Sequence, residues 1–96
     1  MNLKRTEIET ALQSKGFNEV TKKKGHNFFY LNVDGKDVGI RTKTSRGSKY
    51  REIAEPLISI MARQINLNKS QFIGFVKCDV KYNDYLEILK SNGVEL

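Results

Sequence analysis

The segment Lys22–Tyr30 (KKKGHNFFY) carries the residues of this chain that are best suited to chemistry. It places the chain's only histidine, His26, between a run of lysines and a run of aromatic residues. A neutral imidazole is a competent general base near pH 7, and a neighbouring cation or burial favours that neutral form. We therefore take His26 as the candidate catalytic residue. The alternative is an ordinary structural histidine on a strand.

If a lone histidine on a basic surface is catalytic, RNA is the substrate that it favours. A base that deprotonates the ribose 2′-hydroxyl lets that oxygen attack its own phosphorus, and nearby cations stabilise the charge that develops there. DNA lacks this hydroxyl. Cys78 is the only cysteine, which excludes a thiol cluster for zinc, and no glycine-rich phosphate loop is present. We therefore expect no metal and no cofactor.

A second basic segment, Lys43–Arg51 (KTSRGSKYR), combines four cations with hydroxyl groups and a glycine. We predict a polar loop over Lys43–Lys49 that leads into the second helix. A helix N-terminus favours anions, so this segment could hold phosphate, with a solvated loop as the alternative. The expected nucleic-acid contacts of both segments are Lys22, Lys23, Lys24, Phe28, Tyr30, Arg41, Lys43, Arg46, Lys49 and Arg51.

Length and charge agree with a small nucleic-acid-binding protein. The 96 residues correspond to one domain, and 17 Lys and Arg against 11 Asp and Glu give a net charge of +6. Such a surface attracts polyanions, whose bound counterions are released on contact. The N-terminal sequence lacks the apolar region of a signal peptide, and no apolar run approaches the ~20 residues of a membrane span. We expect a cytoplasmic protein with no membrane partner.

Apolar periodicity and turn residues predict an α+β fold of the order α-β-β-β-α, with a three-stranded antiparallel meander and helices on one face. One or two short helices follow. The predicted elements begin with a helix over Leu3–Lys15 and strands over Glu19–Lys23, His26–Val33 and Asp37–Thr42. The apolar stripe Ile53, Leu57, Ile60, Met61 and Ile65 predicts a second helix, and Pro56 fits it either if the helix starts near Ala54 or if the helix is kinked at Pro56. A short helix opened by a capping box at Asn68–Gln71 and a helix over Tyr82–Ser91 follow. A strand at Phe72–Val76 is the alternative for the short helix.

The dipeptide Asp34-Gly35 is typical of a two-residue hairpin turn, which sets the register of the two strands that flank it. The predicted pairs are Val33 with Lys36, Leu31 with Val38, Phe29 with Ile40, Tyr30 with Gly39, Phe28 with Arg41, and His26 with Lys43. Leu31, Val38, Phe29 and Ile40, together with Val33, give an apolar face that should meet the helices. The other face then carries His26, two aromatic rings and two cations. Aromatic rings stack on single-stranded bases, for ~1–3 kcal/mol per base. The alternative is that the C-terminal helices cover Phe28 and Tyr30.

The chain resembles the HicA-type toxins, which are small RNA-cleaving partners of HicB antitoxins. The similarity lies in Leu12–Phe17 (LQSKGF), Lys23–His26 (KKGH), Asp34-Gly35 and Leu67–Phe72 (LNKSQF). The resemblance implies a fold like that of double-stranded RNA-binding domains, with His26 at the position of the catalytic histidine. It further implies a metal-independent mRNA endoribonuclease that an antitoxin neutralises. On this reading residues 1–76 form the HicA-like domain, and residues 77–96 form a helical extension packed on it.

The chain is also similar to the double-stranded RNA-binding domain itself, through Gly47–Arg51 (GSKYR) ahead of a helix. That resemblance implies a module that binds RNA or DNA without chemistry. A protein-interaction module is a third alternative, and it would require an exposed apolar patch.

Overall fold

In the computed structural model, β3 (His26–Val33) and β4 (Lys36–Ser45) form a hairpin, with β3 as the central strand of the sheet and β4 at its edge. The structure describes residues 2–23, 25–45, 51–77 and 79–96, with the side chains of residues 21–23 excepted. Asp34 and Gly35 both have positive φ, at 52° and 80°. A two-residue turn of this kind matches the twist of the flanking strands. The predicted turn is therefore confirmed, and Val33 pairs with Lys36 as expected.

The third strand, β2 (Phe17–Lys23), completes an antiparallel meander of order β2-β3-β4. It begins two residues earlier than predicted. β4 is longer than predicted at both ends, so the polar loop expected from Lys43 is wrong for Lys43–Ser45, which continue the strand. Thr44 favours the extension at the C-terminal end of β4, because its β-branched side chain suits an extended backbone.

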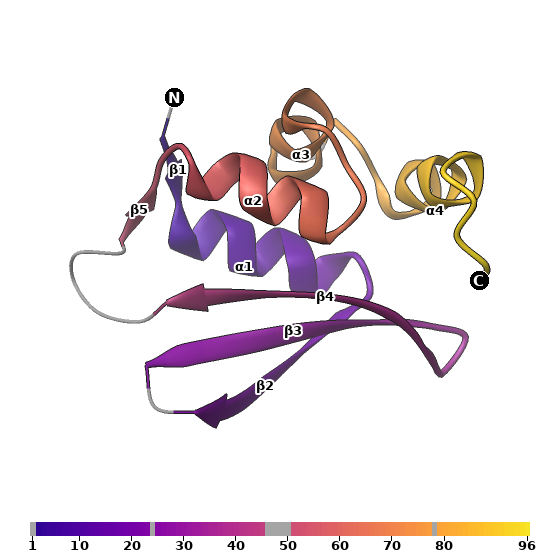
Figure 1. Ribbon diagram of the computed structural model, residues 1–96, viewed down its shortest axis with the longest axis horizontal. Helices are drawn as coiled ribbons and strands as arrows, with labels where there is room; N and C mark the ends of the chain where they lie inside the picture. The colour runs from indigo at the N-terminus through magenta and orange to yellow at the C-terminus, as the bar shows by residue number, and fades with distance from the viewer. Residues whose placement is uncertain (1, 24, 46–50, 78) are drawn as a thin grey trace.

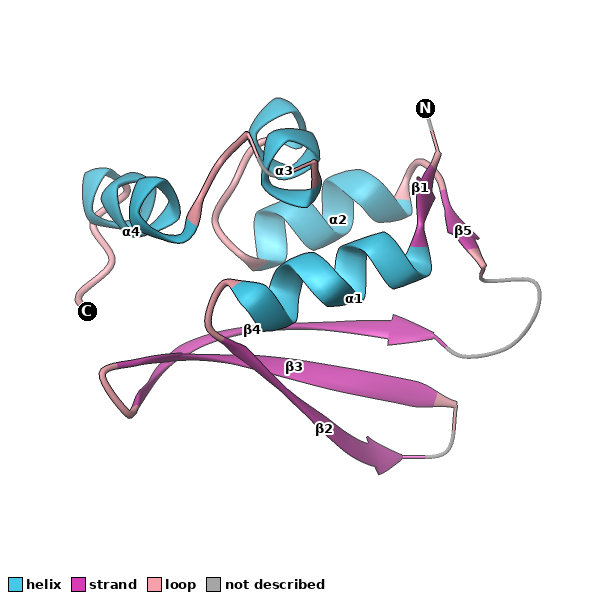
Figure 2. Ribbon diagram, turned by 180° about the vertical axis from the view of Figure 1, so that it is seen from behind, coloured by secondary structure: helices cyan, strands magenta, loops and turns pink. Residues whose placement is uncertain are grey.

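Two helices, α1 (Arg5–Ser14) and α2 (Leu57–Gln64), cover one face of the sheet (Figure 1). Their buried residues are Ile8, Ala11 and Leu12 of α1 and Ile58, Met61 and Ala62 of α2. The other face carries no helix in the described part of the chain, as the reverse view shows (Figure 2). The α+β class, the strand meander and the one-sided packing of helices are confirmed.

A second, two-stranded ladder was not predicted. β1 (Leu3–Lys4) pairs antiparallel with β5 (Glu52–Ile53). Leu3 and Ile53 face each other in this ladder and are both buried, which accounts for its formation. The expected helix over Leu3–Lys15 therefore starts only at Arg5.

The second helix starts after Pro56, at Leu57, and not near Ala54. Pro56 lacks a backbone N–H and is the N-cap, where no such group is needed. The Glu55 carboxylate accepts hydrogen bonds from the backbone N–H (2.9 Å) and hydroxyl (2.6 Å) of Ser59. These bonds to Ser59 hold the pKa of Glu55 below its usual value. The predicted apolar stripe is only partly buried, because Leu57 and Ile60 are exposed.

The last two helices match their predictions. α3 (Lys69–Val76) opens with the capping box of Asn68 and Gln71, so the alternative of a strand at Phe72–Val76 is wrong. α4 (Tyr82–Ser91) has the predicted bounds. In Figure 1, α3 lies on the side of α1 and α2 away from the sheet, and α4 lies toward the end at which the β3–β4 turn is found. None of the helices described is long and apolar enough to cross a bilayer.

Tyr85 joins α4 to the rest of the core. Its ring packs against Phe17 and Phe75, with centroids 6.0 and 5.1 Å away, and its hydroxyl donates to the Ile65 carbonyl at 2.9 Å. Burial raises the pKa of the Tyr85 phenol well above its usual value. Because the phenol of the unfolded chain ionises near pH 10, the folded state loses relative stability as the pH rises above ~10.

We predict that Tyr85→Phe lowers the free energy of unfolding at pH 7 by ~1–3 kcal/mol, because it leaves the Ile65 carbonyl without this donor. Urea denaturation measures this change. Tyr82→Phe is the control, since the Tyr82 hydroxyl makes no hydrogen bond in the described residues and should change stability little. Above pH ~10 the gap between wild type and Tyr85→Phe should narrow. A gap that is independent of pH would contradict this account.

Candidate nucleic-acid interface

The β3–β4 pairing shifts by two residues partway along the hairpin. Asn32 pairs with Asp37, but Tyr30 pairs with Arg41, so the single residue between them in β3 faces three residues of β4. Gly39 lies in this bulge with φ of 83°, and its N–H donates to the Asp37 carboxylate at 2.8 Å. Such a φ favours glycine, and an aspartate side chain readily bonds the backbone two residues ahead.

The predicted partners beyond the bulge are therefore wrong by two residues. The observed pairs are Tyr30 with Arg41, Phe29 with Thr42, Phe28 with Lys43 and His26 with Ser45, where we expected Gly39, Ile40, Arg41 and Lys43. Side chains alternate between the faces of a strand, so a shift by an even number leaves every residue on its predicted face. The predicted assignment of side chains to the two faces of the hairpin is therefore confirmed, although the predicted pairs beyond the bulge are wrong.

The uncovered face of the sheet brings together five of the predicted site residues. His26, Phe28 and Tyr30 project from β3 and are partly buried, while Arg41 and Lys43 project from β4 and are exposed. Neither aromatic ring belongs to the hydrophobic core, and α3 and α4 lie on the helical side. The alternative in which the C-terminal helices cover Phe28 and Tyr30 is therefore wrong. We call this set, together with Ser45, the open face.

Ser45 is the nearest polar partner of His26 among the described residues. The Ser45 Oγ lies 3.4 Å from His26 Nδ1, and the His26 ring lies 6.3 Å from the Phe28 ring, centroid to centroid. The guanidinium of Arg5 donates to the Ser45 carbonyl at 2.9 Å. His26 is thus positioned from β4, and β4 is held in turn by α1. Lys43, expected opposite His26, is its diagonal neighbour on the same face.

The helical face of the same strands is fixed by partly buried hydrogen bonds. Thr44 is buried, and its hydroxyl donates to the Glu9 carboxylate at 2.6 Å. Asn27 donates to the same carboxylate at 3.3 Å. Thr42 donates to Gln64 at 2.6 Å. These bonds fix the backbone of the residues that alternate with the open face, so they set the positions of His26 and Lys43 indirectly.

Two shallow hollows follow the outer edge of β4, and both are lined by Lys43 and Gln64. The larger, of about 160 Å³, also involves Phe28 and Arg41. The smaller, of about 80 Å³, is further lined by Thr44, Ser45, Ile53, Leu57, Ile60 and Met61. An exposed apolar rim on α2, formed by Leu57 (42% exposed) and Ile60 (37%), therefore borders the basic edge of the sheet.

The lysine run before His26 is only partly described. Lys22 and Lys23 are the last two residues of β2, and the backbone of Lys23 pairs with that of His26. Lys24, Arg46 and Lys49 lie outside the described residues. A role for these five cations stays a prediction.

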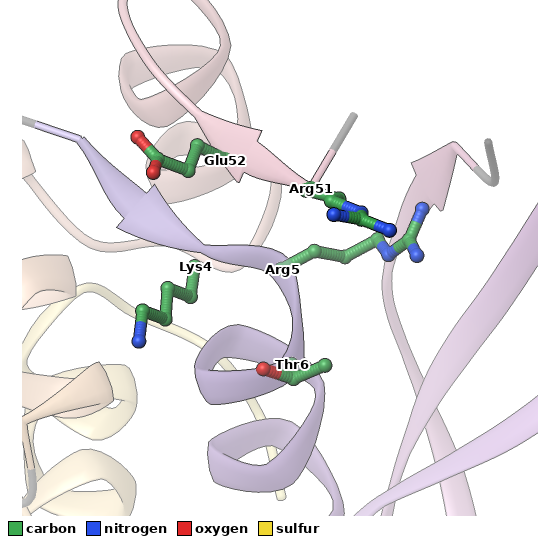
Figure 3. Close-up of a pocket in the computed structure, with 5 residues that line it drawn as sticks. All are labelled: Lys4, Arg5, Thr6, Arg51 and Glu52. Carbon is green, nitrogen blue, oxygen red and sulfur yellow. The ribbon is translucent and has the colours of Figure 1, made fainter. Parts of the chain in front are cut away.

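Arg51 lies at a different helix from the one predicted. It does not lead into α2, because β5 intervenes, and its carbonyl instead accepts a hydrogen bond of 2.8 Å from the N–H of Arg5. It therefore lies at the start of α1. A pocket of about 340 Å³ opens there, lined by Lys4, Arg5, Thr6, Arg51 and Glu52 (Figure 3).

Lys4 and Arg5 were not among the predicted nucleic-acid contacts. Nothing local to those residues could have revealed the pocket, because it depends on pairing between segments about fifty residues apart.

Comparison with known proteins gives no relative. No family model matches the chain, and neither does any curated protein or solved structure. Within the described residues, no group of three or more His, Cys, Asp or Glu side chains is placed to hold a metal ion. The function must therefore be argued from the open face and the basic pocket.

We predict that Glu9→Ala lowers the free energy of unfolding by ~1–3 kcal/mol, because it removes the acceptor of the buried Thr44 hydroxyl. Urea denaturation measures the change. Glu19→Ala is the matched control, since Glu19 is exposed and its carboxylate accepts from Gln13 at 3.2 Å. If the two variants lose the same stability, Glu9 does not anchor the strands.

Proposed function

We propose that this protein binds RNA, cleaves it without a metal and resembles the HicA-type toxins in doing so. The observation that carries the proposal is the open face, on which the only histidine lies beside two aromatic rings and two exposed cations. A non-catalytic RNA- or DNA-binding module is the alternative. It uses the same face and differs only in the role of His26.

The aromatic residues and cations of the open face would bind single-stranded RNA. Bases stack on Phe28 and Tyr30 because every base has a π-face, and stacking of this kind tolerates many sequences. Arg41 and Lys43 lie directly opposite those rings on β4, where they can contact the sugar-phosphate backbone of the stacked bases. RNA helices hide their base faces, so this arrangement favours unpaired stretches such as those in mRNA.

His26 acts as general base in the proposed reaction. It takes the proton of a ribose 2′-hydroxyl, and the 2′ oxygen forms a bond to the adjacent phosphorus while the bond to the 5′ oxygen breaks. The leaving oxygen takes a proton from water. The products are a 2′,3′-cyclic phosphate and a 5′-hydroxyl. Lys43, the diagonal neighbour of His26, stabilises the negative charge on the phosphorane.

Ser45 orients the His26 ring, because its hydroxyl lies 3.4 Å from Nδ1 and can donate or accept a hydrogen bond there. With Nδ1–H donating to the Ser45 hydroxyl, the lone pair lies on Nε2, which is then the base. Ser45 is a positioning residue and does not touch the substrate. Its own position depends on the hydrogen bond from Arg5 to its carbonyl.

The apolar rim of Leu57 and Ile60 favours a protein partner as well. Large exposed apolar side chains next to a binding surface are typical of protein interaction sites. β4 is an edge strand, whose free hydrogen-bonding groups can pair with a strand of another chain. An antitoxin-like protein seated on this rim would cover Lys43 and Ser45, and so block access to His26.

We predict that purified protein cleaves labelled single-stranded RNA in the presence of EDTA, and that His26→Ala lowers the rate at least ~100-fold because the general base is lost. Analysis of the ends should find 2′,3′-cyclic phosphate. An RNA with 2′-deoxyribose at the cleavage position should stay intact. Lys90→Ala, on the distant helix α4, is the control and should cleave normally. RNA that is bound but left intact by the wild type would establish the non-catalytic alternative.

We predict that a photo-crosslinking amino acid at Ile60 captures one dominant protein in the native cell, and that this protein, once purified, inhibits RNA cleavage. The same crosslinker at Lys90 is the matched control. Failure to enrich one protein at Ile60 over Lys90, or a captured protein that leaves cleavage unchanged, would argue against a partner on this rim.

A further inference from the structure

We propose that the pocket of Lys4, Arg5 and Arg51 binds an RNA backbone phosphate, namely the immediate neighbour of the phosphate held by Lys43 on the open face. This inference rests on the RNA-binding part of the proposed function and not on the cleavage step. It assigns a separate phosphate subsite outside the sheet, at the start of α1.

The pocket is built by backbone pairing. Leu3 and Ile53 anchor the β1–β5 ladder in the core, and the N–H of Arg5 donates to the carbonyl of Arg51. The two arginines therefore leave the ladder at adjacent backbone positions. Figure 3 shows both guanidinium groups directed to the same side, toward the end of β4, while Lys4 and Glu52 extend away from them.

The pocket is lined by more cationic than acidic side chains. Three of its five lining residues are cationic and one, Glu52, is acidic. The Glu52 carboxylate accepts a hydrogen bond from Asn2 at 3.1 Å. No ion pair of Lys4 or Arg51 occurs among the residues the structure describes. The guanidinium groups of Arg5 and Arg51 are directed to the same side and repel each other, and an anion between them relieves the repulsion.

A phosphate is the anion that best matches these side chains. The planar guanidinium group has five N–H donors in a fork that fits two oxygens of one phosphate. Two such groups on one side of the pocket can hold a phosphodiester without base contacts, which positions the RNA but does not read its sequence. The start of α1 adds a favourable dipole.

Ser45 fixes the distance between this pocket and the open face. Its carbonyl accepts from Arg5, and its hydroxyl lies 3.4 Å from His26. Arg5 and His26 therefore contact the same residue, so the pocket and the open face adjoin at the end of β4. A backbone that passes from Lys43 and His26 to Arg5 and Arg51 needs to advance by one nucleotide.

Fluorescence anisotropy with a short single-stranded RNA tests the subsite. The RNA carries 2′-O-methyl groups throughout, so that it binds but cannot be cleaved. We expect Arg51→Gln to reduce the slope of log affinity against log salt by about 0.7, the value for one lost phosphate contact on a single strand. Lys90→Gln removes the same charge from α4 and should leave the slope unchanged. The described contact of Arg51 is made by its backbone, so Arg51→Gln should keep its melting temperature.

A second measurement places the phosphate along the RNA. Each phosphate is replaced in turn by an uncharged methylphosphonate, and the affinities of wild type, Arg51→Gln and Lys43→Gln are compared. In Arg51→Gln, the methylphosphonate at one position should no longer lower the affinity. In Lys43→Gln, the methylphosphonate at another position should lose its effect in the same way. The two positions should be adjacent along the RNA. An unchanged salt slope in Arg51→Gln, the same phosphate for both variants, or phosphates more than one step apart would each overturn the inference.

Cleavage assays on unmodified RNA separate this inference from the proposed function. A wild type that binds RNA with the expected couplings but does not cleave would refute the catalytic role of His26 and leave the phosphate subsite standing. A wild type that cleaves RNA while Arg51→Gln behaves like Lys90→Gln would refute the subsite alone. A wild type that does not bind RNA would refute both.

Discussion

The two extra residues of β4 are the constraint on which the open face depends. A hairpin that loses or gains one residue turns every later side chain to the other face, whereas a change of two restores the alternation. The bulge at Gly39 therefore moves Arg41, Lys43 and Ser45 along β3 without exchanging them for the threonines between them. Ser45 reaches His26 for this reason.

The helices α1 and α2 form hydrogen bonds with β4 on the opposite face of the sheet. Thr42 and Thr44 alternate with the cations of β4 and are bonded to Gln64 and Glu9, one from each helix. A polar buried layer of this kind fixes geometry more closely than apolar contacts do, because an unmade bond in the interior costs free energy. The helices thus fix the backbone of β4 from one side of the sheet, and the rings and cations lie on the other side.

Much of this arrangement follows from local sequence, and the limits of prediction have identifiable causes. The turn at Asp34-Gly35, the capping box at Asn68 and the faces of β3 were predictable because each depends on residues a few positions apart. The bulge was not predictable, since the presence of Gly39 does not determine how many extra residues the bulge adds to β4. The β1–β5 ladder was not either, because two-residue strands have no periodicity and pair across half the chain. The basic pocket and the exposure of Leu57 both follow from that ladder and the later start of α2.

The β1–β5 ladder also makes the basic pocket dependent on the order of synthesis. Arg5 is made early and Arg51 about fifty residues later, and the two meet only when Ile53 has docked against Leu3. A nascent or truncated chain that ends before this pairing holds His26 and the sheet aromatics but has half of its arginine pair. The proposed phosphate subsite would then be complete only in a chain whose second half has folded, even where the hairpin has already formed.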